Sequence, residues 1–263
     1  MGKWVIRIVA LGYLLIVLLG PLGMMIFRTL QDWDAAWAAI TNHATIEAFK
    51  LTLLVTAIAV PVNTVFGIIC GLVIVRKKVR GRGLINAFVD LPLALSPVVV
   101  GLSLVLLYGV NGWFGFLPEH GIDVLFATPA IVIATIFVSL PFVAREVIPT
   151  LREIGDEQEQ AAVTLGASGW QTFWRITLPS IKWAVIYGVV LTTARCFGEF
   201  GAVVVVSGNI EGKTQTATLR VEDAYQFAYG NYAAAYGISL VLALMAIVVL
   251  LSMLLIQRKG SRA

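Results

Sequence analysis

The sequence predicts an all-α integral membrane protein with six transmembrane helices. Of its 263 residues, 59% are hydrophobic and only 13% are charged, whereas soluble domains are about 45–50% apolar and about 25% charged. Six apolar runs follow one another, each about 20 residues long, which is the length a helix needs to cross the hydrocarbon core of a bilayer. The runs occupy residues 5–27, 51–75, 84–108, 129–149, 183–206 and 233–256.

Each run is expected to be a helix rather than a strand of a membrane barrel. The bilayer core holds no water to satisfy backbone polar groups, so a spanning segment is a helix or part of a closed barrel. Barrel strands alternate apolar and polar residues over about ten positions, whereas these runs are continuously apolar. The first run is longer than the apolar region of a signal peptide and lacks a closing cleavage site, so we expect a retained helix.

The third run, LPLALSPVVVGLSLVLLYG, is the most interrupted, with Pro92 and Pro97 inside it. Proline in a membrane helix frees backbone carbonyls, which neighbouring helices or cavity water then satisfy. Two interpretations remain open. The run is a kinked helix that packs closely at Gly101 and Ser103, because small residues let helices approach. Alternatively it lines a pathway, for which Ser96 and Ser103 are the candidate residues.

The distribution of basic residues predicts the orientation of the chain. Cytoplasmic loops of membrane proteins carry an excess of Lys and Arg. Fourteen of the nineteen basic residues lie before the first run, between the second and third, around the fourth-to-fifth connection, or after the sixth. Both termini are therefore expected in the cytoplasm, and the net charge of +4 reflects topology rather than nucleic-acid binding. The fourteen are Lys3, Arg7, Arg76, Lys77, Lys78, Arg80, Arg82, Arg145, Arg152, Arg175, Lys182, Arg258, Lys259 and Arg262.

The cysteine and histidine residues give no sign of redox or metal chemistry. Cys70 and Cys196 both fall inside apolar runs, away from an oxidising aqueous compartment. We expect them to behave as small hydrophobic residues. His43 and His120 are isolated in outside loops without the spacing of metal ligands, so no metal site is expected.

The stretch SGNIEGKT at 207–214 superficially resembles a phosphate-binding loop, which requires Gly, four residues, and then Gly-Lys-Ser/Thr. Here only three residues separate Gly208 from Gly212, and Ser207 holds the position that needs glycine. No strand leads into the stretch, and the predicted orientation puts it outside, where ATP is absent. We therefore expect an outside loop and no nucleotide-binding loop in this chain.

One long polar segment, EIGDEQEQAAVTLGASGWQTFWRITLP at 153–179, separates the fourth run from the fifth. Residues 153–165 are good helix formers with acidic residues in the first turn, and Gly166 is a typical helix stop. Two interpretations remain open. The segment is a solvated connector with interfacial aromatic residues, or it is a docking element that presents Ala161 and Ala162 to a partner.

A second short helix is expected after the glycine. Ser168 and Gln171 have the spacing of a capping box, in which each residue satisfies a backbone N–H of the other. Trp170, Phe173 and Trp174 then share one helix face, because residues three and four apart are neighbours.

The polar segment also resembles a known signature. QAAVTLGASGWQTFWRITLP is similar to the cytoplasmic signature of permease subunits of ABC importers: Glu-Ala-Ala, three residues, Gly, nine residues, then Ile-x-Leu-Pro. Gln160 stands where the family has Glu, and Glu159 precedes it. The resemblance implies a coupling helix that sits in a groove of a separate cytoplasmic ATPase. The matching positions are Ala161, Ala162, Gly166, Ile176, Leu178 and Pro179.

The resemblance also implies a division of labour between subunits. In this family, ATP-driven closure of two ATPase subunits moves two permease subunits between inward-open and outward-open states, and a periplasmic binding protein delivers the substrate. It follows that this chain is not expected to be an enzyme or to bind a cofactor. ATP and Mg²⁺ would belong to the partner ATPase subunits.

The fifth run carries two charges, Arg195 and Glu199, at i and i+4 on one helix face. A charge at the bilayer centre costs about 2.5–3.5 kcal/mol on insertion scales, so such residues face a cavity or each other. The two form either a self-paired structural couple or part of an anion pathway, in which the Arg195 guanidinium makes transient contacts to a tetrahedral oxyanion. In the second case Gly198 and Gly201 would allow close helix approach.

Around Arg195 and Glu199, the resemblance becomes specific to one group of importers. ARCFGEFGA and LPLALSPVVVGL are similar to permeases of the sulfate and molybdate importer group, and GNIEGKTQTATLRVEDAYQ is most like the W-type subunit of the sulfate/thiosulfate importer. The likeness extends from the second run to the sixth. It implies a T-type permease as heterodimer partner, two ATPase subunits and a periplasmic sulfate-binding protein.

The sequence thus predicts one transmembrane permease domain over residues 1–263, in a bacterial inner membrane, with coupling helices between the fourth and fifth spans. The expected function is half of the pathway of an ATP-driven sulfate/thiosulfate importer. Import of molybdate or tungstate is the alternative substrate. A self-sufficient anion channel or secondary transporter is the alternative of another class, in which residues 153–179 are a mere connector. A third possibility is a structural membrane anchor, which would transport no substrate under any condition.

Overall fold

The computed structural model describes residues 2–77 and 80–260, and within them every regular element is helical. In this part of the chain, five helical segments are long and apolar enough to span a membrane, and a bent pair makes up to six. The predicted all-α membrane fold is confirmed.

The elements are α1 (Gly2–Leu14), η1 (Leu15–Leu19), α2 (Gly20–Gln31), α3 (Trp33–Thr41), α4 (His43–Arg76), α5 (Arg82–Ala94), α6 (Pro97–Tyr108), α7 (Phe116–Glu119), α8 (Thr128–Ser139), α9 (Pro141–Ile154), α10 (Glu157–Thr164), α11 (Gly169–Thr172), η2 (Phe173–Thr177), α12 (Leu178–Phe197), α13 (Val203–Val206), α14 (Ala217–Gln226) and α15 (Ala233–Gly260).

Four of the six predicted spans are helices that cover their apolar runs. Most of them extend past the run, because helical hydrogen bonding continues where the side chains become polar. The second span, for example, begins eight residues before the predicted position 51. The four segments are Val5–Gln31, His43–Arg76 and Thr128–Ile154, and α15 over Ala233–Gly260.

The third predicted span is broken into α5 and α6, which meet at an angle of 107°. Ser96 has extended backbone dihedrals and Pro97 is the first residue of α6. This is the expected effect of a proline, whose ring disfavours the helical conformation of the residue before it. The predicted interruption is confirmed, and α5 and α6 together occupy the run 84–108 as one bent pair.

The fifth predicted span, 183–206, is a continuous helix only as far as Phe197, and this helix begins before position 183. The candidate membrane segment is Gly169–Phe197, so it starts inside the polar segment and stops before the apolar sequence does. Gly198 ends α12, and the four valines that follow form the separate short helix α13. The Glu199 carboxylate accepts the N–H of Ala202 at 3.0 Å, which stabilises the turn between the two helices.

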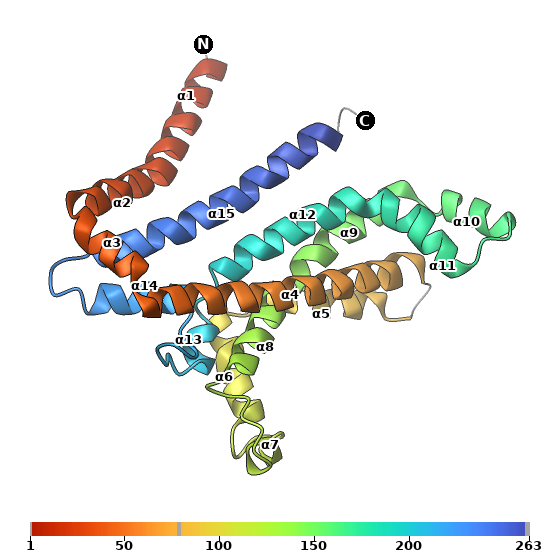
Figure 1. Cartoon of the computed structure of the whole chain (residues 1–263). Coiled ribbons are helices and arrows are strands. Elements are labelled where there is room, and N and C mark those ends of the chain that lie inside the picture. The colour runs from red at the N-terminus through yellow and green to blue at the C-terminus, as the bar shows by residue number, and fades with distance from the viewer. Residues whose placement is uncertain (1, 78–79, 261–263) are drawn as a thin grey trace.

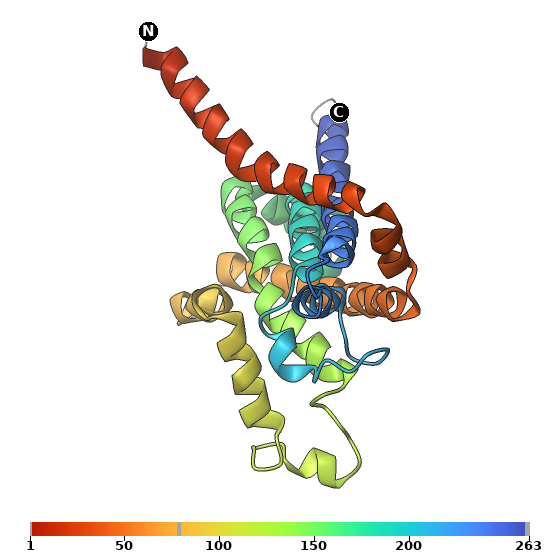
Figure 2. The ribbon, with the colours of Figure 1, turned by 90° about the vertical axis from the view of Figure 1, so that its left-hand side faces the viewer.

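The core that supports the polar segment consists of α4, α9 and α12, which run side by side (Figures 1 and 2). Gly67 of α4 and Gly188 of α12 both face Val143 of α9. A Cβ atom at either glycine would lie 2.7 Å from an atom of Val143, which is far inside van der Waals contact. The three helices therefore pack backbone against side chain, and Leu151 and Ile181 fill the same cluster.

The polar segment and α3 lie at opposite ends of this core (Figure 1). α10 and α11 extend beyond the ends of α4 and α12, whereas α3 and α14 pack against the start of α15. α1 projects away from the other helices (Figures 1 and 2), and no residue in the most apolar window of Val5–Gln31 is buried. A helix that is apolar all round suits contact with lipid or another subunit.

The predicted orientation of the termini stays a prediction. Among the basic residues on which it rests, Lys78 and Arg262 lie outside the described residues, and the side chains of Lys3, Arg258 and Lys259 are not described either.

Candidate functional site

The first part of the polar segment is the helix α10, with Glu157 and Glu159 in its first turn. The chain leaves α10 through Gly166, which has a φ of 87°. The N–H of Ala167 donates to the carbonyl of Ala162 at 3.0 Å, and the N–H of Gly166 donates to the carbonyl of Val163 at 2.9 Å. This is a Schellman arrangement, in which glycine adopts a left-handed conformation at low cost. The predicted stop at Gly166 is confirmed.

The helix predicted over 153–165 is nevertheless wrong at its start. α9 continues to Ile154, and Gly155 then breaks the helix with a φ of 73° and a ψ of −173°. This backbone region is essentially restricted to glycine. α10 is thus a separate short helix, and the backbone of Gly155 interrupts the helix between α9 and α10.

The second part of the polar segment begins with the predicted capping box, which is confirmed. The N–H of Gln171 donates to the hydroxyl oxygen of Ser168 at 3.3 Å, and the N–H of Ser168 donates to the side-chain oxygen of Gln171 at 2.9 Å. α11 then continues into the π-helical turn η2, which leads into α12 at Leu178. Such π-turns inside helices often occur at functional sites.

The outer face of the polar segment is apolar and open to a partner. Leu165 is 88% exposed and Trp170 is 71% exposed, and Val163 and Trp174 are exposed beside them. The rings of Trp170 and Trp174 lie edge to face at 5.5 Å, and both contact Phe173, so the predicted aromatic cluster is confirmed. Exposed apolar patches of this kind mark interaction sites.

The predicted coupling residues divide between the outer face and the interior. Gln160, Ala161, Gly166 and Pro179 are exposed, and Ile176 and Leu178 are partly buried. The expectation that both alanines face a partner is wrong for Ala162, which is only 8% exposed and packs inside the chain. Successive residues of a helix point about 100° apart, so Ala161 faces outward while Ala162 faces the chain.

Glu159 points inward and forms an ion pair with Arg76 at the end of α4, with 2.8 Å between Oε2 and Nε. From the sequence, Arg76 is only one of the basic residues that predict the orientation of the chain. The two residues are 83 positions apart, and no local pattern links them.

The break after α12 contains the second candidate group. Arg195 and Glu199 form an ion pair, with 2.8 Å between Nη1 and Oε2. The Glu199 side chain is 3% exposed, whereas that of Arg195 is 30% exposed. The predicted pairing is therefore present, and the arginine keeps an accessible edge. Contact of an anion with that edge stays a prediction.

The two broken spans meet at this point. A Cβ atom on Gly101 of α6 would lie 2.8 Å from the carbonyl oxygen of Ala202, and one on Gly201 would lie 2.9 Å from Cβ of Pro97. Close approach at Gly201 thus agrees with the expectation. Gly198 does not contribute, because a Cβ there would meet nothing nearer than 4.0 Å.

The serines predicted in the third span are exposed. Ser96 immediately precedes the α6 proline that contacts Gly201, so it lies beside the break of the fifth span. Ser103 lies within α6, and its hydroxyl donates to the carbonyl of Val99 at 2.8 Å. Their part in a pathway stays a prediction.

The SGNIEGKT stretch is a closed polar turn rather than an open phosphate cradle. The Asn209 amide donates to Asp223 of α14 at 2.9 Å, and the Gln215 amide donates to Asn209 at 3.0 Å and also to Asp223. Ser207 and Gln215 are buried. Within the stretch, the N–H of Asn209 donates to Ser207 and that of Ile210 donates to Thr214, which is consistent with the predicted loop.

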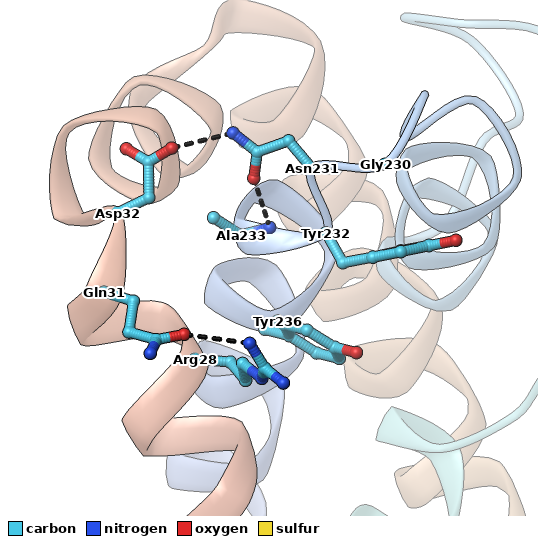
Figure 3. Close-up of a pocket in the computed structure, with 8 residues that line it drawn as sticks. All are labelled: Arg28, Gln31, Asp32, Gly230, Asn231, Tyr232, Ala233 and Tyr236. Atoms are coloured by element: carbon cyan, nitrogen blue, oxygen red, sulfur yellow. Dashed lines mark hydrogen bonds between the residues drawn. The ribbon is translucent and has the colours of Figure 1, made fainter.

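A pocket of about 420 Å³ lies where α2 and α3 meet the start of α15 (Figure 3). Asn231 donates to Asp32 at 2.7 Å and accepts the N–H of Ala233 at 3.0 Å, and Arg28 donates to Gln31 at 3.0 Å (Figure 3). The Asn231 bonds join Asp32, between α2 and α3, to the start of α15, whereas the Arg28–Gln31 bond lies within α2.

The fold and the coupling segment together match a known class of membrane subunit. The family described as "Binding-protein-dependent transport system inner membrane component" matches residues 63–261. The chain belongs to this family, and it is a multi-pass protein of a bacterial inner membrane. Its predicted likeness to the permeases of ABC importers is confirmed.

The particular relatives are the W-type permeases. The chain is 48% identical over 263 residues to "Sulfate transport system permease protein CysW" of Synechocystis sp., covering 98% of this chain and 94% of that protein. It is 61% identical over 181 residues to the CysW of Synechococcus elongatus, covering 68% of this chain and 63% of that relative's length. The predicted W-type resemblance is confirmed.

The fold is also shared with a solved transporter. A chain in the crystal structure of a bacterial alginate ABC transporter, in complex with an alginate pentasaccharide-bound periplasmic protein, superposes with a TM-score of 0.80 at 20% identity. The match covers 99% of this chain and 95% of that chain.

Proposed function

We propose that this chain is the W-type permease subunit of an ATP-driven importer for sulfate and thiosulfate, in which it forms half of the translocation pathway. The observation that carries the proposal is the 48% identity to a CysW sulfate permease along 98% of this chain. Because the similarity extends along nearly the whole chain, it includes the membrane helices, the coupling segment and the region of Arg195 and Glu199.

The coupling segment supports an ATP-driven mechanism. Leu165, Trp170 and Trp174 form an exposed apolar surface on short, well-capped helices at one end of the core. A partner ATPase would bury this surface, with Gln160 and Ala161 at the contact. Gln160 replaces the carboxylate of the family signature, and its amide still donates and accepts hydrogen bonds.

We further propose the partners and the division of chemistry. A related T-type permease would complete the pathway, two cytoplasmic ATPase subunits would bind ATP and Mg²⁺ and hydrolyse the nucleotide, and a periplasmic sulfate-binding protein would deliver the anion. This chain would then be a translocation subunit without catalytic residues or a cofactor of its own, and both its termini would lie in the cytoplasm.

Arg195 is the residue proposed to contact the anion. Its guanidinium keeps an exposed edge while Glu199 holds one of its nitrogens. A guanidinium donates two parallel hydrogen bonds to an oxyanion, and the neighbouring carboxylate would weaken that contact. The anion would therefore leave readily, as transport requires.

The experiment that tests the substrate is competition in the complete complex. The two permeases and the ATPase subunits are reconstituted in vesicles with the binding protein, and ATP-dependent uptake of radiolabelled sulfate is measured with unlabelled thiosulfate or molybdate. We expect thiosulfate to compete strongly and molybdate weakly. Stronger competition by molybdate would replace the proposed substrate with the alternative oxyanion.

A further inference from the structure

One group of polar contacts joins the coupling helix to the membrane core. Arg76 is the last residue of α4. Its Nη1 donates to the carbonyl oxygen of Leu151 at 3.0 Å, and its Nη2 donates to the carbonyl oxygen of Gly155 at 2.6 Å. Its Nε donates to one carboxylate oxygen of Glu159, and the other accepts the hydroxyl of Thr177 at 2.8 Å. These five residues are called the Arg76 cluster below.

The Arg76 cluster is shielded from solvent. The side chains of Arg76 and Glu159 are 15% and 20% exposed, and Thr177 is buried. Hydrogen bonds between charged groups are stronger than neutral ones. The planar guanidinium donates hydrogen bonds from all three of its nitrogens in fixed directions. The cluster therefore fixes the relative positions of its members more closely than a simple attraction between charges would.

The contacts of the cluster join four elements. Arg76 belongs to α4, Leu151 to α9, Glu159 to α10 and Thr177 to the turn η2 that continues into α12. α4, α9 and α12 pack tightly on one another through the glycine contacts at Val143. The cluster therefore connects α10 to a closely packed three-helix unit.

α10 has few other connections to that unit. Within this fully described helix, Ala162 is the one buried residue. Gly155 separates α10 from α9, and its positive φ interrupts the helical backbone between them. A force applied to α10 would thus bend the chain at Gly155 unless the Glu159 contacts carry it to α4 and η2.

We propose that the Arg76 cluster transmits the displacement of α10 to the membrane helices, with Arg76, Glu159 and Thr177 acting as positioning residues. The inference rests on the proposed function, because it concerns the response of this segment to a partner ATPase. Without the cluster, α10 still docks on the ATPase through its outer face, but its movement no longer moves α4 and α12 together.

Two sets of variants test this role in the complete reconstituted complex. Glu159→Gln removes the charge, and Arg76→Lys removes the guanidinium fork. Thr177→Val removes the hydroxyl that donates to Glu159, whereas Thr177→Ser keeps it. The matched controls are Asp90→Asn and Arg145→Lys, because Asp90 and Arg145 form another Arg–carboxylate pair at 2.9 Å, on the surface between α5 and α9.

The readouts are co-purification of the ATPase subunits, the rate of ATP hydrolysis, and the amount of sulfate carried per ATP hydrolysed. We expect Glu159→Gln, Arg76→Lys and Thr177→Val to keep the ATPase subunits and to hydrolyse ATP. The sulfate carried per ATP is expected to fall about tenfold, within the usual range of coupling between two sites. Thr177→Ser and both controls are expected to retain the wild-type ratio.

Two results would overturn the inference. One is an unchanged ratio of sulfate to ATP in both Glu159→Gln and Thr177→Val. The other is loss of the ATPase subunits from these variants, because the cluster would then shape the docking surface instead of transmitting its movement. A wild-type complex that moves no sulfate with ATP would instead contradict the proposed function, so the two failures are distinguishable.

Discussion

The Nη1 of Arg195 lies 2.8 Å from the Oε2 of Glu199 across the end of α12, and the carboxylate is the more deeply buried of the two groups. Glu199 also accepts the N–H of Ala202, so its charge holds the turn that ends the helix. The arginine has an exposed edge, and this asymmetry is the reason for proposing a structural role for Glu199 and a transport role for Arg195.

Arg195→Ala is expected to lower sulfate uptake by about tenfold or more, since hydrogen bonds to charged groups contribute about 1.5–3 kcal/mol. It also leaves the Glu199 carboxylate buried without its partner, which destabilises the fold. The double variant Arg195→Ala with Glu199→Gln removes that penalty. We expect it to assemble normally and still to transport poorly. Recovery of uptake in the double variant would make Arg195 a structural counter-ion only.

Ala161→Trp is expected to abolish co-purification of the ATPase subunits without unfolding the chain, because Ala161 is exposed on α10. Ala162→Trp is expected to destabilise the coupling segment itself, because Ala162 is buried and overpacking costs about 1–3 kcal/mol or more. The measurements are pull-down of the ATPase and the midpoint of thermal unfolding in detergent. Normal ATPase binding by Ala161→Trp would remove this face from the docking surface.

Gly101→Ala is expected to destabilise the protein by about 1–3 kcal/mol, because the added methyl group would lie 2.8 Å from Ala202 and Val205. Gly83→Ala is the matched control, since its Cβ would meet nothing within 4 Å. We expect the control to be neutral or stabilising by up to about 1 kcal/mol, because alanine favours a helix more than glycine does. Equal unfolding midpoints for the two variants would refute the close contact between the broken spans.

Gly166→Ala is expected to loosen the end of α10, because its φ of 87° costs a residue with a side chain about 1–2 kcal/mol. Amide hydrogen exchange in α10 would then accelerate by roughly 5- to 30-fold. Gly169→Ala, at a position without a positive φ and with open space around it, should leave exchange unchanged. The same protection in both variants would show that α10 does not depend on its glycine stop.

The features that the sequence predicted well depend on neighbouring residues. The capping box of Ser168 and Gln171, the stop at Gly166 and the break before Pro97 each follow from a local rule. The end of α12 was missed because hydrophobicity continues through Val203–Val206 after the helix has stopped. Apolar composition measures the preference for the bilayer and not the continuity of backbone hydrogen bonds.

Features that depend on distant contacts could not be predicted. Arg76 and Glu159 meet because α4 and α9 pack together and the chain continues through Gly155 into α10. The inward direction of Ala162 and the 107° angle between α5 and α6 likewise depend on tertiary packing. The identity of the coupling segment was nevertheless predictable, because its signature is a set of local spacings.

The central claim is that this chain moves sulfate only when a separate ATPase hydrolyses ATP. Its most direct test is sulfate uptake by the reconstituted complex, with either the active ATPase subunits or a variant of them that binds ATP without hydrolysing it. We expect uptake with the active subunits and none above background with the inactive ones. Sulfate uptake that continues with the inactive ATPase, or without any ATPase subunit, would contradict the account and indicate a self-sufficient channel or secondary transporter.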